Sequence, residues 1–214
     1  MKTFNEEEFP NLLDNINLTY SSIEDILKEY PLEFSSIRNQ MVEWRLSLPM
    51  FATAFYKCIY FTKSIPNQKQ FYEYYLSSNK EYFDRHNFAD DIYEGIRARV
   101  YRAYPSLVRD IHFSKMLYEK LNDYKVIYNT RLDTDEGVDV MLKTESQYYG
   151  VNLFTNTSRA KASREKKSKR HTNFSNVSYL DLPVNFNGSK KCGDFFLYSE
   201  EEINELLDKI KQND

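Results

Sequence analysis

The chain has 214 residues, of which 41% are hydrophobic and 16% aromatic, and its formal net charge is −3. A chain of this length can bury a core without disulfides or a structural metal, and its aromatic content excludes a disordered chain. Only five glycines and six prolines exclude collagen-like and low-complexity proteins. An acidic start, the lack of a long apolar run and two distant cysteines, Cys58 and Cys192, predict a cytoplasmic protein that does not span a membrane.

Charge is unevenly distributed along the chain. Residues 1–30 carry two lysines and seven acids, and residues 199–214 carry two lysines and six acids. Residues 159–171 carry seven basic residues against Glu165 alone, a net charge of +6. Such a block is typical either of a solvated helix face or of a surface that attracts phosphate. The net charge of −3 therefore does not exclude a nucleic-acid ligand.

The first 104 residues favour helices, because their apolar side chains recur at helical spacing. Helices are expected over 6–15, 21–30, the stretch between Pro31 and Pro49, 50–60, 71–76 and 90–104. Ser21 or Ser22 is expected to cap the second of these. The stripe between the two prolines consists of Phe34, Ile37, Met41, Trp44 and Leu46. We expect this stripe, like the others, to form core.

A further helix is expected from Pro105 to Leu121, and it divides the chain into a helical region (1–104) and a mixed α/β region (105–214). Five strands are expected after it, in KVIYN, GVDVML, YYGVNLFTN, 176–182 and 193–198. The segment TRLDTDE is expected to be a polar loop, and residues 159–171 a helix. Ser199 is expected to cap a last helix. The fold class predicted is α+β, a helical portion packed on a small mixed sheet.

Common catalytic motifs are absent: the sequence contains no phosphate-binding loop, dinucleotide fingerprint, zinc spacing or nucleophile elbow. One acid does interrupt a core strand, namely Asp139 between Val138 and Val140. Because a lone buried carboxylate is costly, Asp139 is expected either to bind a metal or to pair with Arg131. The nearby acids are expected either to join that site or to form a solvated loop; they are Asp133, Asp135 and Glu136.

The order helix, strand, strand, strand, helix, strand over about residues 105–182, with Asp139 on the second strand, resembles the core of the PD-(D/E)XK nuclease superfamily. In that family an acid on the second strand and an acid plus a lysine on the third hold Mg²⁺ and orient a water for phosphodiester cleavage. Here Asn152 stands at the position of the second acid and Phe154 at that of the lysine. An amide oxygen can still ligate a hard cation. The resemblance therefore implies a Mg²⁺ site made by Asp139 and Asn152.

The resemblance also implies a cation in place of the missing lysine. Lys161 is the catalytic candidate that we assign, and Arg159 and Lys167 are its alternatives. Hydroxyl groups of Thr155, Thr157 and Ser158 precede the expected basic helix, whose N-terminus would favour an anion.

Two further groups of residues are candidates for binding phosphate or bases. Within 159–171, helical spacing places Arg164, Lys167 and His171 on one face, and Arg159, Lys166 and Arg170 on another. Arg109 and His112 share a face of the helix that starts at Pro105, where they either contact phosphate or form ordinary polar pairs. The aromatic neighbours either stack on bases or form strand core; they are Tyr148, Tyr149 and Phe154.

These observations predict a nucleic-acid-binding protein built on a nuclease-like core. The first alternative is a Mg²⁺-dependent endonuclease of phage defence or restriction. The second is a protein-interaction or regulatory factor of bacterial or phage origin, for which we expect a protein partner and no salt-dependent affinity for nucleic acid. Binding of a small nucleotide is compatible with the same residues.

Overall fold

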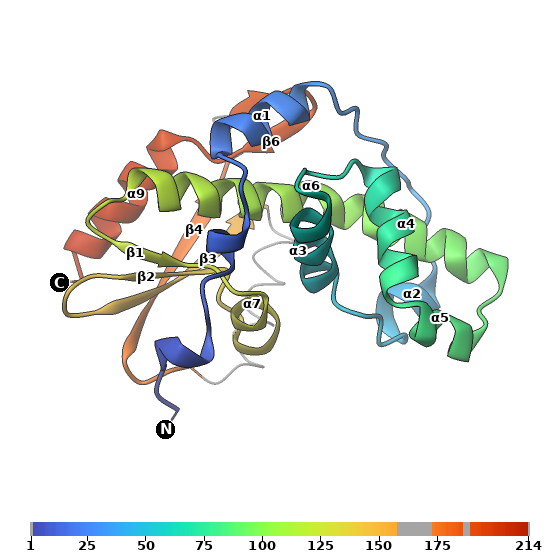
Figure 1. Cartoon of the computed structure of the whole chain (residues 1–214), viewed down its shortest axis with the longest axis horizontal. Helices are drawn as coiled ribbons and strands as arrows, with labels where there is room; N and C mark the ends of the chain where they lie inside the picture. Colours follow the sequence, from blue (N-terminus) through green and yellow to red (C-terminus); the bar gives the residue numbers. More distant parts are fainter. Residues whose placement is uncertain (1, 158–172, 186–188, 214) are drawn as a thin grey trace.

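The structure, a computed structural model, describes residues 2–157, 173–185 and 189–213. It is an α+β fold, as the sequence predicts. A mixed sheet lies at one end and most of the helices lie at the other, with one long helix, α6, running along the molecule between them (Figure 1). None of the helices in the described ranges is long and apolar enough to cross a membrane.

The described helices and strands follow in chain order. Short 3₁₀ turns at Glu6–Glu8 and Leu12–Asn15 come before the helices. The helices are α1 (Tyr20–Lys28), α2 (Gln40–Trp44), α3 (Phe51–Thr62), α4 (Gln68–Ser78), α5 (Lys80–His86), α6 (Asp90–Lys120), α7 (Thr130–Glu136) and α9 (Glu200–Lys211). The strands are β1 (Lys125–Ile127), β2 (Val140–Lys143), β3 (Tyr148–Thr155), β4 (Val177–Val184), β5 (Lys190–Cys192) and β6 (Phe195–Leu197).

The main sheet has the strand order β1-β2-β3-β4, and β5 pairs with β6 in a separate hairpin. Strands β1, β2 and β3 form an antiparallel meander, whereas β4 runs parallel to β3. A parallel neighbour requires a crossover connection. Residues 156–176 make that connection, and they include the basic stretch of the sequence.

The two faces of the sheet belong to different apolar clusters. Val140, Val151 and Leu182 belong to the main core, which also holds the buried side chains of α6. Met141 and Val177 face a smaller core, where Phe4 and Phe9 from the N-terminal segment pack with Phe174. The N-terminal segment therefore covers part of the sheet instead of forming the helix expected over 6–15.

Helix α6 is one element, although two helices meeting at Pro105 were expected. Its 31 residues run from Asp90 to Lys120 with Pro105 inside. The predicted boundary between residues 104 and 105 consequently falls within a helix. Side chains from both sides of Pro105, such as Tyr104 and Val108, lie in the same core.

The prediction for residues 31–49 was wrong. Only Gln40–Trp44 is helical, and the side chain that faces the core is Val42, which is fully buried. Phe34 and Trp44, which were expected to be core, are each 80% exposed. Contacts from other parts of the chain hold residues 33–37 in a non-helical path: the N–H of Glu33 bonds to Gln68, and Arg102 donates to the carbonyl of Ile37.

Smaller differences have local causes. The expected loop TRLDTDE is helix α7, because the side chain of Asn129 caps it and Gly137, at φ 75°, ends it. Thr19, not Ser21 or Ser22, is the N-cap of α1, and Ser22 completes a capping box. Pro183 lies inside β4, which is tolerated because β4 is an edge strand of the main sheet. Ser199 caps α9 as predicted.

Candidate functional site

Polar side chains from β3, from β4 and from the residue before β2 lie near one another at one end of the main sheet. Asn152 on β3 pairs in register with Asp181 on β4, and Val151 pairs with Val140 on β2. Asp139 comes directly before Val140. Its carboxylate Oδ2 accepts a hydrogen bond from the N–H of Leu153 at 2.7 Å, which holds Asp139 against β3. The sheet register thus brings together the two residues that the sequence predicted as metal ligands.

Asn152 has an unusual environment. Its side chain is 1% exposed, and its amide Nδ2 donates to Asp181 Oδ1 at 3.1 Å. Because an ionised carboxylate only accepts hydrogen bonds, Asp181 fixes the amide nitrogen on its own side. The carbonyl Oδ1 has no hydrogen-bond partner in the part of the chain that the structure describes. A buried acceptor left in this way costs about 1–3 kcal/mol.

Further carboxylates influence this end of the sheet. Burial raises the pKa of Tyr128 well above its ordinary value, and the charges of Asp133, Asp110 and Asp139 raise it further. Burial, followed by Asp110, likewise raises the pKa of Tyr198, which Arg109 partly opposes. The hydroxyl of Tyr198 donates to the carbonyl oxygen of Leu182 at 3.2 Å. Asp110 of α6 and Asp139 before β2 therefore raise the pKa of both buried phenols, and Asp133 of α7 raises that of Tyr128.

At the position that the predicted resemblance gives to a lysine, β3 carries a phenylalanine. Phe154 is half-buried near the end of β3, and Lys161, the predicted replacement, lies outside the described residues. A lysine does reach the neighbouring strand from α9: Lys209 Nζ donates to the main-chain oxygen of Asp181 at 2.7 Å. Neither Lys209 nor Asp181 was predicted, because their proximity depends on the pairing of β4 with β3 and on the packing of α9.

Arg109 and His112 do not form the phosphate-binding face that their spacing suggested. His112 is fully buried, and its Nε2 bonds to Glu24 Oε1 at 2.9 Å. Arg109 is 6% exposed, and its Nε donates to the carbonyl oxygen of Phe196 at 2.7 Å. Packing of α6 against α1 and β6 buries both side chains, so we assign them to polar contacts inside the fold.

Other candidates also have structural partners. Arg131 lies 3.7 Å from Asp135, not beside Asp139, and Glu136 pairs with Lys2. Tyr149 is fully buried core, and Tyr148 packs edge-on against Phe4 with ring centroids 4.9 Å apart. These residues therefore support the sheet and its N-terminal cover.

The predicted basic face lies outside the described residues: Arg159, Arg164, Lys167, Arg170 and His171. Its point of attachment is described. The N–H of Asn156 donates to the carbonyl oxygen of Val184 at 2.8 Å, which extends the pairing of β3 and β4 by one residue. Along the sequence, the basic stretch begins shortly after Asn156.

Clusters of three or more histidine, cysteine or acidic side chains arranged to hold a metal ion are absent from the described ranges. A cation at this end of the sheet would therefore need the amide oxygen of Asn152 in addition to carboxylates. No protein-family model, no curated protein and no solved structure matches the chain. The site's own residues are thus the basis for assigning a function.

Proposed function

We propose that the protein binds nucleic acid through the phosphate backbone, with residues 159–171 as the main contact. The observation that supports this most is the place of the basic stretch in the chain. A segment of net charge +6 lies in the sequence between β3, which carries Asn152, and β4, which carries Asp181. Arginine and lysine supply most contacts to phosphate, and their number sets the affinity and its dependence on salt.

The order of strands adds support. A helix before the first strand, an antiparallel meander and a parallel fourth strand supply part of the α-β-β-β-α-β order of the nuclease superfamily, whereas α7 stands between β1 and β2, and the second helix of that order falls on residues outside the described ranges. Proteins that share this order need not share an activity. Phe154 at the lysine position favours binding over cleavage.

Charge reversal within the basic stretch tests this function. Binding to a labelled duplex and to a labelled single strand would be measured for the wild type and for Arg164→Glu with Lys167→Glu, over a series of salt concentrations. The double reversal is expected to weaken binding at least tenfold and to reduce its salt dependence. The control reverses two exposed lysines elsewhere, Lys69→Glu and Lys211→Glu. The proposal would be refuted if the two double variants bound the duplex with the same affinity as each other, and likewise the single strand.

A second candidate function is Mg²⁺-dependent cleavage of phosphodiester bonds, which Oδ1 of Asn152 favours because it has no hydrogen-bond partner among the described residues. A hard cation takes carboxylate and amide oxygens as ligands, and Asp139 with Asn152 offers one of each on adjacent strands. Such a cation would supply Lewis-acid activation of a water and would offset the negative charge of the surrounding acids. Asp139 would ligate it, and Asn152 would no longer bury an unpaired oxygen.

Incubation of plasmid DNA and of RNA with the protein in Mg²⁺ or Mn²⁺ separates the two functions. Asp139→Asn is the informative variant, because an amide oxygen still accepts the hydrogen bond from Leu153 while the charge is removed. Cleavage by the wild type that disappears in Asp139→Asn, with an unchanged melting temperature, would establish a nuclease. If the protein cleaves neither substrate in Mg²⁺ or in Mn²⁺, binding remains the proposed function.

A further inference from the structure

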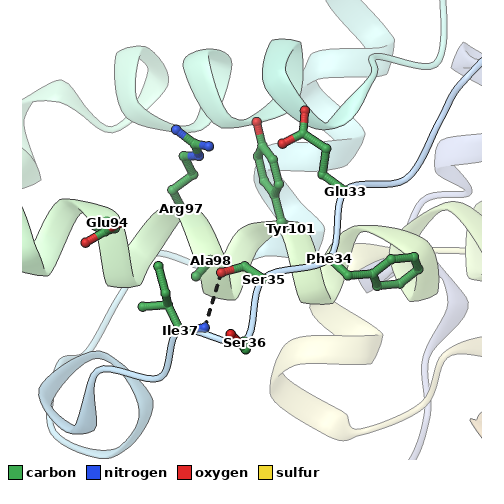
Figure 2. A pocket seen from close by; sticks show the side chains of 9 residues that line it. All are labelled: Glu33, Phe34, Ser35, Ser36, Ile37, Glu94, Arg97, Ala98 and Tyr101. Carbon is green, nitrogen blue, oxygen red and sulfur yellow. Dashed lines mark hydrogen bonds between the residues drawn. The ribbon is translucent and has the colours of Figure 1, made fainter.

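A hollow lies between one face of α6 and the non-helical segment 33–37 (Figure 2). It has a volume of about 310 Å³, which falls in the range of small-ligand sites. The α6 side of the hollow consists of side chains that share a face of the helix, namely Glu94, Arg97, Ala98 and Tyr101. Two segments distant in the sequence therefore enclose a site of small-molecule size.

Hydrogen bonds from other elements fix the wall that residues 33–37 form. The N–H of Glu33 donates to Gln68 Oε1 at 2.7 Å, and Gln68 Nε2 donates to the carbonyl oxygen of Glu33 at 3.1 Å. Arg102 Nη1 donates to the carbonyl oxygen of Ile37 at 2.5 Å. Because both ends of the segment are anchored to helices, the hollow is formed before a ligand arrives, which lowers the entropic cost of binding.

Opposite charges flank Tyr101 at one end of the hollow. The guanidinium of Arg97 lies 5.4 Å from the centroid of the Tyr101 ring. Figure 2 shows the carboxylate of Glu33 next to the Tyr101 hydroxyl, on the side away from Arg97. Burial raises the pKa of Tyr101, the charge of Glu33 raises it further, and Arg97 opposes this. A guanidinium, a phenol and a carboxylate are thus gathered at this end.

The charged side chains of the hollow do not neutralise one another. Within the described ranges, the side chains of Glu33, Glu94 and Arg97 make neither an ion pair nor a hydrogen bond. Glu94 and Arg97 are three residues apart on α6, a spacing at which an acid and an arginine can pair. Two carboxylates and one guanidinium give the lining a net charge of −1. This charge disfavours a phosphate and suits a ligand with one anionic and two cationic groups.

The positions of the two acids set the length of that ligand. Glu94 and Tyr101 are seven residues apart on α6, which is about 10 Å along the helix axis. Arg97 and Glu33 are available to one end of the ligand, beside Tyr101, and Glu94 to the other. Ala98 contributes apolar surface to the same wall. A ligand with a charged head, an aliphatic middle and a cationic tail fits this order.

We propose that the hollow binds a free α-amino acid with a long cationic side chain, such as arginine. Its carboxylate pairs with Arg97, its ammonium group pairs with Glu33, and its side-chain cation reaches Glu94. The pair between guanidinium and carboxylate is directional and charge-assisted, so it distinguishes an amino acid from a simple diamine. This site is separate from the basic stretch and does not depend on the proposed binding of nucleic acid.

Isothermal titration calorimetry of the full chain with L-arginine tests the proposal. The comparison ligands are agmatine, which lacks the carboxylate, and L-citrulline, whose side chain is neutral. Each is expected to bind roughly 3- to 10-fold more weakly than L-arginine, between the effect of an exposed ion pair and that of a charge-assisted hydrogen bond. Equal affinity for the three ligands, or no saturable binding of L-arginine, would overturn the proposal.

Variants assign the two ends of the ligand. Arg97→Gln is expected to weaken L-arginine by a similar factor without weakening agmatine, and Glu94→Gln is expected to weaken L-arginine and agmatine but not L-citrulline. The matched controls are Arg85→Gln and Glu81→Gln, at exposed positions of α5 outside the hollow. Both controls are expected to bind L-arginine as the wild type does. If Arg97→Gln weakens agmatine as much as L-arginine, the carboxylate does not pair with Arg97 and the proposal fails.

Discussion

Gln68 Nε2 donates a hydrogen bond to the main-chain oxygen of Tyr101 across 3.1 Å. Within α6 that oxygen would accept from the N–H of residue 105, and residue 105 is a proline, which has no N–H. Gln68 is 5% exposed and also bonds to both main-chain polar groups of Glu33. A side chain from α4 thus replaces the missing helix bond and lets α6 continue through Pro105.

Replacing Gln68 with leucine should therefore destabilise the protein. The variant leaves the oxygen of Tyr101 buried without a donor, which costs about 1–3 kcal/mol of unfolding free energy. Urea unfolding would measure the loss. In a Pro105→Ala background the helix regains its own N–H, so the contribution of the Tyr101 contact should disappear and the cost of Gln68→Leu should shrink. An equal cost in both backgrounds would show that Gln68 acts through Glu33 alone.

Glu24 should make stability depend on acidic pH. Hydrogen bonds from His112 and Lys190 lower the pKa of its carboxyl to about 2, although burial opposes this. A group with a lowered pKa in the folded state stabilises the fold above its unfolded pKa, and this contribution is lost as pH falls from about 4.5 to about 2. A shift of that size corresponds to about 3 kcal/mol.

Unfolding free energies at pH 5 and pH 3 would test the role of Glu24. The wild type is expected to lose more stability over this interval than Glu24→Gln, because the amide keeps hydrogen bonding but does not titrate. Glu201→Gln, at an exposed position of α9, is the control and should behave as the wild type. An identical pH profile for Glu24→Gln and the wild type would contradict the prediction.

Local pattern was sufficient for the sheet and for part of the site. Alternating and continuous apolar runs predicted β1, β2, β3 and β4, and the interruption of one run by Asp139 predicted the candidate site. The partner of Asn152 was not predictable in this way. Asp181 becomes its neighbour only through the parallel register of β3 and β4, which no short-range pattern specifies.

Long-range contacts explain the errors. Helical spacing predicted a buried face for Phe34 and Trp44, but side chains of α4 and α6 hold residues 33–37 out of a helix. His112 was a candidate for contacting phosphate because local spacing does not reveal its partner. That partner, Glu24, is 88 residues away in the sequence. In α7 a short polar sequence is helical because Asn129 caps it. Each error concerns a segment whose conformation depends on a partner that is distant in the sequence, or on a capping side chain, and not on its own composition.

Gly95→Ala should disturb the packing of α2 against α6. Alanine favours a helix over glycine by up to about 1 kcal/mol, but its Cβ would lie 2.6 Å from Asn39 Cβ and 3.0 Å from Val42 Cγ2. We expect the clash to dominate and to cost about 1–3 kcal/mol. Asn39→Gly removes the facing Cβ and weakens the cap of α2 only slightly. The melting temperature lost in Gly95→Ala should therefore be partly recovered in the double variant with Asn39→Gly. If it is not recovered, the strain does not come from the contact with Asn39 Cβ.

Asn152→Leu should leave stability unchanged or raise it. Leucine has a similar size and removes the buried Oδ1 that has no partner within the described residues, while Asp181, an exposed residue, can turn to water. Asn129 is the matched control: it is 5% exposed, its Nδ2 donates to Pro10, and its Oδ1 accepts from Arg131 N–H. Asn129→Leu should cost about 0.5–2 kcal/mol, because α7 loses its N-cap and the main-chain oxygen of Pro10 loses its donor. Denaturant unfolding of both variants decides whether the amide of Asn152 is needed for stability or is free to bind a ligand. An equal loss of stability in the two variants would show that Asn152 is needed for folding, and the case for a cation at this end of the sheet would fail.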